Sequence, residues 1–402
     1  MDARIIPAML ITLPSAALMR ALLAHSGGPT AVINASLLGI VEEARRHSVI
    51  TGVLGARFGI EGLLAGDFVD LLALSPERLA AVGRVTSSAI GTSRRAVTSS
   101  DIERVLDVCH AYDVRWLFYT GGNGSMETAR QIAAVARASA RAPGVIGVPK
   151  TIDNDLAATD HTPGYPSAAR FFACAARDIG ADNRALRGLV QIIEVLGRHT
   201  GWITAATTLA RHRPDDAPHL VYLPEQPLPL ARFLDDVQRV FDRLGRCTVT
   251  VCEGQLDEHG APFGADVRMS SRGPLATNLA HRLALLVTER LGIKARGEKP
   301  GLLGRVSTEL RSEVDWLEAR RVGEAAVRAA VAGESGMMVT LERLPGLDYG
   351  CTTSLVPLER VAGTERRFPP EWIDHSGQGV RSDFRDWAAP LVGPLSIDEA
   401  ID

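Results

Sequence analysis

The feature that most constrains this chain is an alternation of short apolar runs with longer stretches of helical periodicity. Strands are expected over residues 20–24, 115–120, 144–148, 189–195, 219–223 and 247–252. Helices are expected over residues 31–47, 101–112, 125–141, 165–182, 200–211, 230–244, 275–292 and 309–333, with a last short helix near 380–389. Apolar strands separated by helices are typical of βαβ units, whose mostly parallel sheets are covered on both faces. The pattern therefore predicts an α/β fold.

Length and composition fit a large soluble protein. With 402 residues the chain is expected to divide into two domains. The formal net charge of -3 gives no basic surface for nucleic acid. No apolar run reaches the roughly 18 residues that a membrane span needs. The 5 cysteines are scattered without a CxxC pair, which argues against a zinc site and a disulfide framework and indicates a reducing, cytoplasmic location.

The first 18 residues are interpreted as an extension that precedes the fold. Residues 5–13 are apolar and small residues follow, an arrangement that faintly resembles a secretory signal. Asp2 and the single arginine Arg4 make a poor basic region in front of this run. We expect residues 1–18 to be disordered or to reflect a mis-assigned start.

Two glycine-rich segments follow expected strands and precede expected helices. The first reads HSGGPT, residues 25–30, and the second reads TGGNGS, residues 120–125. Their glycines let backbone N–H groups approach a phosphate at a helix N-terminus. Each segment by itself can be a tight turn, and Ser125 can simply cap its helix. Two such loops in one fold favour an enzyme that handles phosphates, because ligands of α/β folds bind beyond the carboxyl ends of the strands.

A third segment, PKTIDND at residues 149–155, combines a lysine with two carboxylates. Lys150 places a cation where a phosphate oxygen can lie, and Asp153 and Asp155 point to the same side if the segment is extended. Two close carboxylates beside a lysine suit a general base with an electrostatic partner. A solvated Asx turn is the alternative, and the spacing alone slightly favours it.

Candidate phosphate-binding arginines lie in later segments. Arg198, in EVLGRHTGW after the strand 189–195, can bond a phosphate through its planar guanidinium. Arg296 and Arg305 are expected in irregular segments after strands, and Glu253 follows the strand 247–252. The arginines suit a sugar-phosphate clamp, although each can also be a solvated surface charge.

Taken in order, these segments resemble the phosphofructokinase family. The motifs are SGGPTAVINASL, GTSRR, YTGGNGSMETA, GVPKTIDNDL, EVLGRHTGW, LPEQP and VCEG, which span about residues 20–340. The wording of GGPTAVINASL and PKTIDND, with HTPGY at residues 161–165, is most similar to the pyrophosphate-dependent (mixed-substrate) branch. The resemblance implies a 6-phosphofructokinase of glycolysis. Such an enzyme transfers a phosphoryl group from pyrophosphate to the 1-hydroxyl of fructose 6-phosphate, giving fructose 1,6-bisphosphate, with Mg²⁺ as cofactor.

The resemblance also implies roles for individual residues. Asp153 matches the family's catalytic base, and Lys150 and Arg94 supply positive charge to the transferring group. The implied donor site comprises Gly28, Gly122, Asn123, Gly124 and Ser125. The implied fructose 6-phosphate site comprises Thr151, Asp155, Leu196, Gly197, Arg198, Glu253, Arg296 and Arg305. The resemblance offers Asn123 as a weak metal ligand, and it implies that Thr151 and Asp155 contact the sugar and the water shell of the metal.

The glycine-rich loop at Asn123 departs from the family pattern. ATP users carry GGDG there, and pyrophosphate users carry GGND or GGDD, whereas this chain reads GGNG. Asparagine is a neutral and weaker Mg²⁺ ligand than aspartate. Gly124 leaves room for ATP, whereas Lys150 is typical of pyrophosphate users. An ATP-dependent enzyme and a catalytically weakened paralogue that only binds sugar phosphate remain alternatives.

The expected architecture is two doubly wound Rossmann-like domains with parallel-rich sheets and the active site in the cleft between them. Residues 19–160 are expected to form a phosphoryl-donor domain, to which about 305–340 return. Residues 161–304 are expected to form a fructose 6-phosphate domain, and 341–402 a C-terminal tail packed on the domains. We expect a homodimer or homotetramer that binds fructose 6-phosphate and pyrophosphate or ATP, without nucleic-acid or membrane partners.

Overall fold

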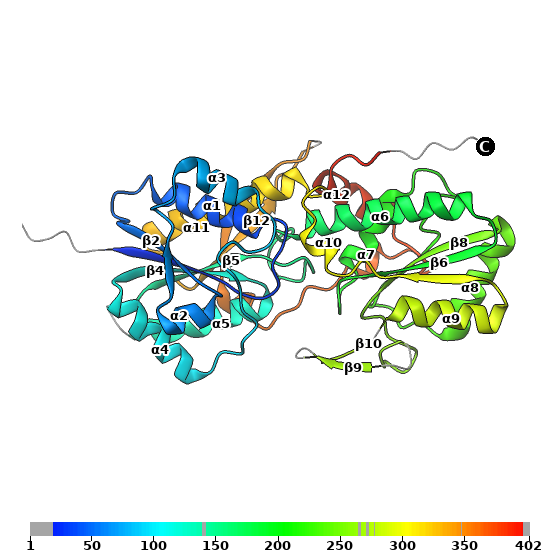
Figure 1. The fold of residues 1–402 in the computed structure, drawn as a ribbon, viewed down its shortest axis with the longest axis horizontal. Coiled ribbons are helices and arrows are strands. Elements are labelled where there is room, and N and C mark those ends of the chain that lie inside the picture. The colour runs from blue at the N-terminus through cyan, green and yellow to red at the C-terminus, as the bar shows by residue number, and fades with distance from the viewer. Residues whose placement is uncertain are drawn as a thin grey trace, which may run out of the picture.

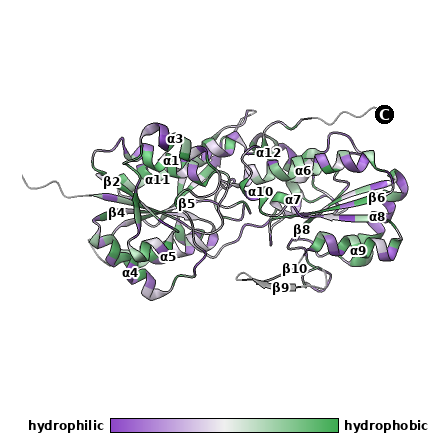
Figure 2. Ribbon diagram, viewed as in Figure 1, coloured by the Kyte–Doolittle hydropathy of each residue, from purple (hydrophilic) through white to green (hydrophobic). Residues whose placement is uncertain are grey.

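The computed structural model describes residues 19–138, 142–263, 267–270, 273–276, 278–346 and 348–396, so the extension expected at 1–18 lies outside the described residues. Two α/β units lie side by side (Figure 1), and the expected α/β class is confirmed. Apolar residues concentrate where helices face the sheets (Figure 2). Among the described residues, no helix is long and apolar enough to cross a bilayer.

The first unit is built on a seven-stranded sheet in the order β13-β12-β5-β4-β1-β2-β3. Its strands are β1 (Arg20–His25), β2 (Gly52–Ala56), β3 (Phe68–Asp70), β4 (Val114–Gly121), β5 (Gly144–Pro149), β12 (Met337–Arg343) and β13 (Cys351–Pro357). The central strands run parallel, whereas β3 and β13 pair antiparallel at the two edges. The strand order reverses between β1 and β4, and ligands of such sheets bind outside the carboxyl ends of the strands at that point.

Helices cover both faces of this sheet. One face carries α1 (Ile33–Ala44), α3 (Pro76–Arg84) and α11 (Glu313–Val331), and the other carries α2 (Ile60–Ala65), α4 (Ser99–Ala111) and α5 (Asn123–Ala136). Strand β1 shows why both faces are apolar, since Leu23 packs on the first side and its neighbour Leu22 on the second.

Helix α11 returns from late in the chain to pack closely against α1. A Cβ atom added at Gly39 of α1 would lie 2.0 Å from the Arg320 carbonyl oxygen, and one added at Gly323 would lie 2.1 Å from that of Ser36. Neither position has space for a side chain, so the two glycines let the helix backbones touch. The chain thus leaves the first unit and comes back to it.

The second unit contains a four-stranded parallel sheet in the order β11-β6-β8-β7. Its strands are β6 (Leu189–Val195), β7 (Leu220–Tyr222), β8 (Arg246–Cys252) and β11 (Ala295–Glu298). One face is covered by α6 (Tyr165–Ala185), α7 (Trp202–Ala206) and α12 (Ser382–Val392), and the other by α8 (Leu230–Leu244) and α9 (Leu279–Leu291) (Figure 1). Strands β9 (Val267–Ser270) and β10 (Gly273–Ala276) form a separate antiparallel pair. Short helical segments are η1 (Thr207–Ala210), α10 (Leu303–Val306), η2 (Leu358–Arg360) and η3 (Pro370–Trp372).

Aromatic contacts fix the C-terminal segment to the second unit. The Trp202 ring on α7 lies 5.1 Å from the Phe368 ring, 5.9 Å from Trp372 and 5.3 Å from Trp387. Such pairs add stabilisation beyond the area they bury. The segment after β13 is therefore packed across α7.

The expected strands and helices are all present, but several elements were missed. Strands β2, β3, β11, β12 and β13 and helices α2 and α3 were not predicted. Most of these strands are short or partly exposed, whereas β12 contains an apolar run at residues 337–339 and was overlooked. Residues 275–276, expected to be helical, belong to β10. The helix expected at 200–211 is divided between α7 and η1.

We expect Gly39→Ala to destabilise the protein, because its new methyl group must push α1 away from α11. Overpacking of this kind costs about 1–3 kcal/mol. Gly144→Ala is the matched control, since its Cβ would make only ordinary contacts at 3.6–3.8 Å. Urea denaturation should give a clearly lower midpoint for Gly39→Ala alone. Equal midpoints for the two variants would contradict the close helix crossing.

Candidate active site

The loops that follow β1, β4 and β5 are hydrogen-bonded to one another. Ser26 N donates to the Thr120 carbonyl at 2.8 Å, and Lys150 N donates to the Gly121 carbonyl at 3.0 Å. The glycine-rich loops and the PKTIDND segment therefore lie together where the strand order reverses. In the first of these loops Gly27, with φ of +79°, adopts a left-handed conformation that favours glycine.

Lys150 braces the loop that follows β1. Its side chain is only 2% exposed, and Nζ donates to the carbonyl oxygens of Ser26 at 2.9 Å and Gly28 at 2.6 Å. Burial, and then the charge of Lys150, lowers the pKa of His25 to about 3, so His25 is neutral. Lys150 thus joins the loop after β5 to the loop after β1 and brings positive charge to both.

Two guanidinium groups meet at Gly28. A Cβ atom added at Gly28 would lie 2.9 Å from Arg305 Nη1 and 3.1 Å from Arg94 Nη2. Burial lowers the pKa of Arg305, the adjacent charge of Arg94 lowers it further, and Asp153 opposes the shift. Arg305 lies on α10, after the last strand of the second sheet, so both units contribute to this positive site. Two neighbouring cations beside a glycine favour a bound anion.

The Asp153 segment is held by its backbone. Thr151 Oγ1 accepts a hydrogen bond from Asp153 N at 3.1 Å, and Thr200 Oγ1 donates to the Asp153 carbonyl at 3.0 Å. Asn154, fully buried with φ of +54°, accepts from Thr162 N at 3.0 Å. The alternative of a solvated Asx turn is therefore wrong.

Asn123 and Asp155 form a pair with two oxygens left over. Asn123 Nδ2 donates to Asp155 Oδ2 at 2.9 Å. Asn123 Oδ1 and Asp155 Oδ1 are buried and have no hydrogen-bond partner among the described residues. Buried polar atoms of this kind need a partner, and carboxylate and amide oxygens are ligands that suit a hard divalent cation. No group of three or more histidine, cysteine or acidic residues able to hold a metal occurs in the described part of the chain.

The other residues of the glycine-rich loop after β4 differ in the space around them. A Cβ atom at Gly124 would meet no atom within 4 Å, so this position faces open space. A Cβ at Gly122 would lie 3.4 Å from Thr151 Cβ, which places Gly122 beside the Asp153 segment. Ser125 is buried, with its hydroxyl against Gly121. A larger residue therefore fits at position 124.

A second cluster lies at the ends of β6 and β8. Gly254 packs against the Arg198 carbonyl so closely that a Cβ would lie 1.5 Å from it. Burial and then the neighbouring Glu194 raise the pKa of Glu253, while Lys299 and Arg198 oppose the rise. Lys299 Nζ contacts Glu194 Oε1 at 2.6 Å. Leu196 and Gly197 precede Arg198 in the same turn, and Leu196 packs on the apolar core of this unit.

Arg296 and Arg305 lie on different elements. The expectation that Arg296 belongs to an irregular segment is wrong, since it is exposed on the edge strand β11, in register with Gln191. Within the described residues no ion pair reaches Arg296. Arg305 lies on the short helix α10 and contacts the Gly28 loop instead.

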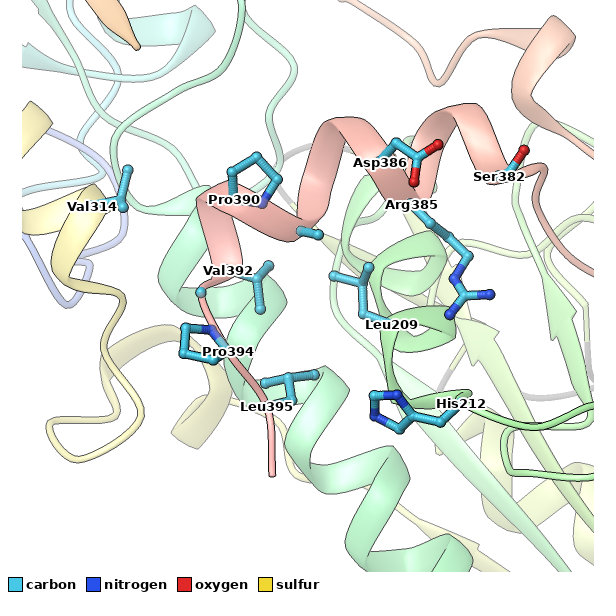
Figure 3. A pocket seen from close by; sticks show the side chains of 12 residues that line it. Leu209, His212, Val314, Ser382, Arg385, Asp386, Pro390, Val392, Pro394 and Leu395 are labelled. Atoms are coloured by element: carbon cyan, nitrogen blue, oxygen red, sulfur yellow. The ribbon is translucent and has the colours of Figure 1, made fainter. Parts of the chain in front are cut away.

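A separate cavity of about 810 Å³ lies beside α12 (Figure 3). Leu209, His212, Val314, Arg385, Pro390 and Leu395 are among the residues that line it. None of the site residues expected from the sequence is among its described lining. The candidate active site is therefore defined by the converging loops and not by this cavity.

Comparison with known proteins supports the sequence resemblance. The family model for phosphofructokinase matches residues 20–330. The chain belongs to the phosphofructokinase family. It is 39% identical to the pyrophosphate–fructose 6-phosphate 1-phosphotransferase of Rhodospirillum rubrum, over 93% of this chain and 94% of that relative. It is 38% identical to the enzyme of the same name from Xanthomonas campestris, over 92% and 91%. The solved structure of a pyrophosphate-dependent phosphofructokinase from Marinobacter aquaeolei is 33% identical, with a TM-score of 0.86 over 96% of this chain and 94% of that one.

Sequence reasoning missed Arg366, which supports the loop that contains Asp153. Arg366 donates to the carbonyls of Asn154 at 3.2 Å and Asp160 at 2.7 Å, and its backbone N donates to the Asp155 carbonyl at 2.8 Å. The guanidinium also lies 4.5 Å over the Trp202 ring. Arg366 lies more than 200 residues from the loop that it holds, so no local pattern could have indicated the contact.

We expect Gly28→Ala to lower turnover, because the methyl group must displace both guanidiniums. Weakening one charge-assisted hydrogen bond costs about 1.5–3 kcal/mol, or roughly ten-fold or more in kcat/KM. Gly144→Ala, at the opposite end of β5, should leave kcat/KM unchanged. Steady-state kinetics of both variants make the comparison. Wild-type kinetics in Gly28→Ala would show that Arg94 and Arg305 do not act there.

Proposed function

We propose that the enzyme transfers a phosphoryl group from pyrophosphate to the 1-hydroxyl of fructose 6-phosphate, giving fructose 1,6-bisphosphate and orthophosphate. The observation that carries the proposal is the convergence of Arg94 and Arg305 on Gly28, with Asp153 close enough to influence the pKa of Arg305. A carboxylate next to paired cations suits an acceptor hydroxyl facing a phosphoryl group. The names of the relatives from Rhodospirillum rubrum and Xanthomonas campestris support pyrophosphate as the donor.

In the proposed reaction Asp153 takes the proton from the 1-hydroxyl as its oxygen attacks the terminal phosphorus of the donor. The new oxygen–phosphorus bond forms while the bond to the bridging oxygen breaks, and orthophosphate leaves. Arg94 and Arg305 stabilise the negative charge that spreads over the transferring group. Thr151 and Thr200 keep the Asp153 backbone in place, so the base is oriented before the sugar binds.

We assign a divalent cation, Mg²⁺, to the free oxygens of Asn123 and Asp155. Asp155 offers the carboxylate that the glycine-rich loop lacks at positions 123 and 124. When bound, Mg²⁺ would supply positive charge to the donor oxygens. Two protein ligands leave room for water and phosphate oxygens, which Mg²⁺ commonly keeps in its coordination shell.

We assign fructose 6-phosphate to the cluster at Leu196, Gly197, Arg198 and Glu253, with Arg198 on its phosphate and Glu253 on a sugar hydroxyl. The donor would then lie on the first unit, along Gly28 and Gly122–Ser125, as the expected division into donor and sugar-phosphate domains requires. A role for Arg296 in the sugar site, a homodimer or homotetramer, and a cytoplasmic location stay predictions.

ATP as the donor is the second candidate function, and one observation favours it. The space beyond Gly124 is open, so nothing at this position blocks an α-phosphate. The weakened paralogue is disfavoured, because a protein that only binds sugar phosphate has no need of a base whose backbone is fixed from two sides.

We expect Asp153→Asn to lower kcat on the order of 10²-fold or more, with little change in KM for fructose 6-phosphate, since the amide cannot accept the proton. Asp235→Asn, on the exposed face of α8, is the control and should behave as wild type. Steady-state assays with saturating pyrophosphate measure both constants. A variant that keeps most of its kcat would exclude Asp153 as the base.

The donor is tested by assaying wild type and Gly124→Asp with Mg²⁺ and fructose 6-phosphate, separately with pyrophosphate and with ATP. We expect pyrophosphate to support the larger kcat/KM in wild type. In Gly124→Asp any ATP-dependent turnover should fall, because a carboxylate there repels an α-phosphate by charge and bulk. Efficient use of ATP by wild type without turnover of pyrophosphate would replace the proposed donor. Chelation of the metal should abolish both reactions.

A further inference from the structure

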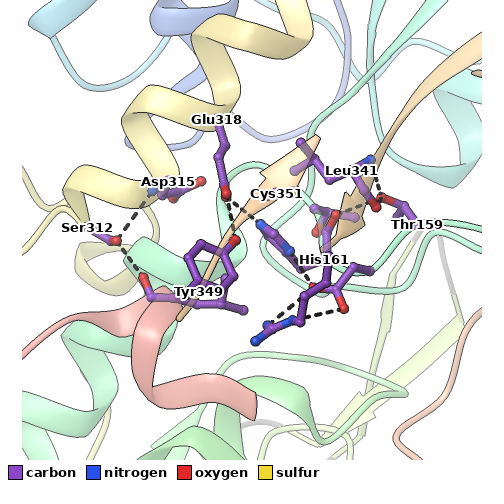
Figure 4. Close-up of polar contacts among 12 residues, drawn as sticks. Thr159, His161, Ser312, Asp315, Glu318, Leu341, Tyr349 and Cys351 are labelled. Carbon is purple, nitrogen blue, oxygen red and sulfur yellow. Dashed lines mark hydrogen bonds and ion pairs between the residues drawn. The ribbon is translucent and has the colours of Figure 1, made fainter. Parts of the chain in front are cut away.

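A buried histidine lies between two carboxylates, outside the residues assigned above. His161 is fully buried, with Nδ1 2.8 Å from Asp160 Oδ2 and Nε2 2.7 Å from Glu318 Oε2 (Figure 4). An ionised carboxylate only accepts hydrogen bonds, so each ring nitrogen must carry a proton to bond its partner. The geometry therefore requires a positively charged imidazolium.

Both carboxylates are held by other elements. Glu318, on α11, accepts a second hydrogen bond from the Tyr349 hydroxyl at 2.6 Å (Figure 4). Asp160 accepts one from Trp387 Nε1 on α12 at 3.1 Å, and it faces Arg343 Nη2 of β12 at 3.3 Å. The imidazolium thus connects the loop that follows the Asp153 segment to α11, β12 and α12.

A short chain of hydrogen bonds leads from His161 to the base. The next residue, Thr162, donates from its backbone N to Asn154 Oδ1 at 3.0 Å and from its hydroxyl to the Thr151 carbonyl at 2.8 Å. Asn154 follows Asp153 directly, and Thr151 Oγ1 accepts from Asp153 N. A displacement of His161 would therefore reach both sides of Asp153.

We propose that the imidazolium of His161, clamped between Asp160 and Glu318, is a positioning residue that holds the Asp153 segment in its reactive orientation. The kinetic part of this proposal rests on the proposed phosphoryl transfer. His161 touches neither the base nor the assigned substrate residues, so its loss should lower kcat and leave the KM values nearly unchanged.

The protonation of His161 makes the proposal testable through the pH dependence of kcat. Burial lowers the pKa of His161, but hydrogen bonds to Asp160 and Glu318 and the charges of these carboxylates outweigh it and raise the pKa to about 8. A histidine whose pKa is higher in the folded than in the unfolded protein stabilises the folded state. This stabilisation is complete below the pKa of the unfolded protein, about 6.5, and is lost as pH rises through about 8. We therefore expect kcat to fall on the alkaline side, near pH 8.

The other titratable groups around His161 do not account for such a fall. Asp160 has a lowered pKa and stays ionised. Burial raises the pKa of Asp315 to about 6, which affects only the acid side. Burial also raises the pKa of the Cys351 thiol to about 12 and raises that of Tyr349, so both stay neutral. Burial lowers the pKa of Arg366 to about 10, so its guanidinium stays charged near pH 8.

The test compares wild type, Glu318→Gln and His161→Gln, with His47→Gln as the control. His47 forms a similar contact with Glu43 at 3.2 Å, beyond the C-terminal end of α1. Removing one carboxylate should move the alkaline fall of kcat in Glu318→Gln downward by about one pH unit. His161→Gln should lose the fall near pH 8, with kcat lowered about ten-fold and KM values within about three-fold. His47→Gln should match wild type.

A wild-type kcat that is flat through pH 8, or a folded Glu318→Gln whose alkaline fall stays in place, would overturn the proposal. If His161→Gln does not fold, Glu318→Gln still decides. A direct readout uses NMR of ¹⁵N-labelled histidine, in which both ring nitrogens of His161 should be protonated at pH 7. A neutral His161 ring at pH 7 would overturn this proposal, whatever the activity of the enzyme. Inactivity with pyrophosphate would overturn the proposed function and leave this proposal standing.

Discussion

The site depends on one electrostatic arrangement, the meeting of Arg305 from the second unit with Arg94 at Gly28 of the first. Burial lowers the pKa of Arg305, the neighbouring charge of Arg94 lowers it further, and Asp153 offsets only part of this shift. An anion between the two guanidinium groups would relieve their repulsion, so the arrangement suits the phosphoryl group that we propose for this place. The absence of a side chain at Gly28 is what allows both guanidiniums to approach.

The path of the chain explains how residues that are far apart in the sequence are held close together in the site. Helix α11 returns to the first unit and packs against α1, where Gly39 and Gly323 let the two backbones touch. The C-terminal segment packs on Trp202. From that segment Arg366 reaches the loop that contains Asp153 and bonds its carbonyl groups. The loop that contains Asp153, the proposed base, is therefore supported by late segments of the chain and not by its own strand alone.

The α/β class, the main strands and the loops that follow β1, β4 and β5 could be predicted from the sequence, because apolar periodicity and glycine-rich turns are local signals. Pairs that form across long distances could not be predicted in this way. Nothing near Asn123 indicates that Asp155 lies beside it, and nothing near Arg305 indicates a contact with Gly28. The buried position of His161 between Asp160 and Glu318 was also missed, since Glu318 lies 157 residues further along the chain.

The most direct test of this account is a crystal structure with fructose 6-phosphate, a divalent cation and a non-hydrolysable bisphosphonate analogue of pyrophosphate. The account predicts that the bisphosphonate lies along Gly28 and Gly122–Ser125 with Arg94 and Arg305 on its terminal group. The sugar 1-hydroxyl should lie within hydrogen-bonding distance of Asp153, and its 6-phosphate should lie on Arg198. A bisphosphonate bound away from Gly28, or a 1-hydroxyl turned away from Asp153, would contradict the central claim.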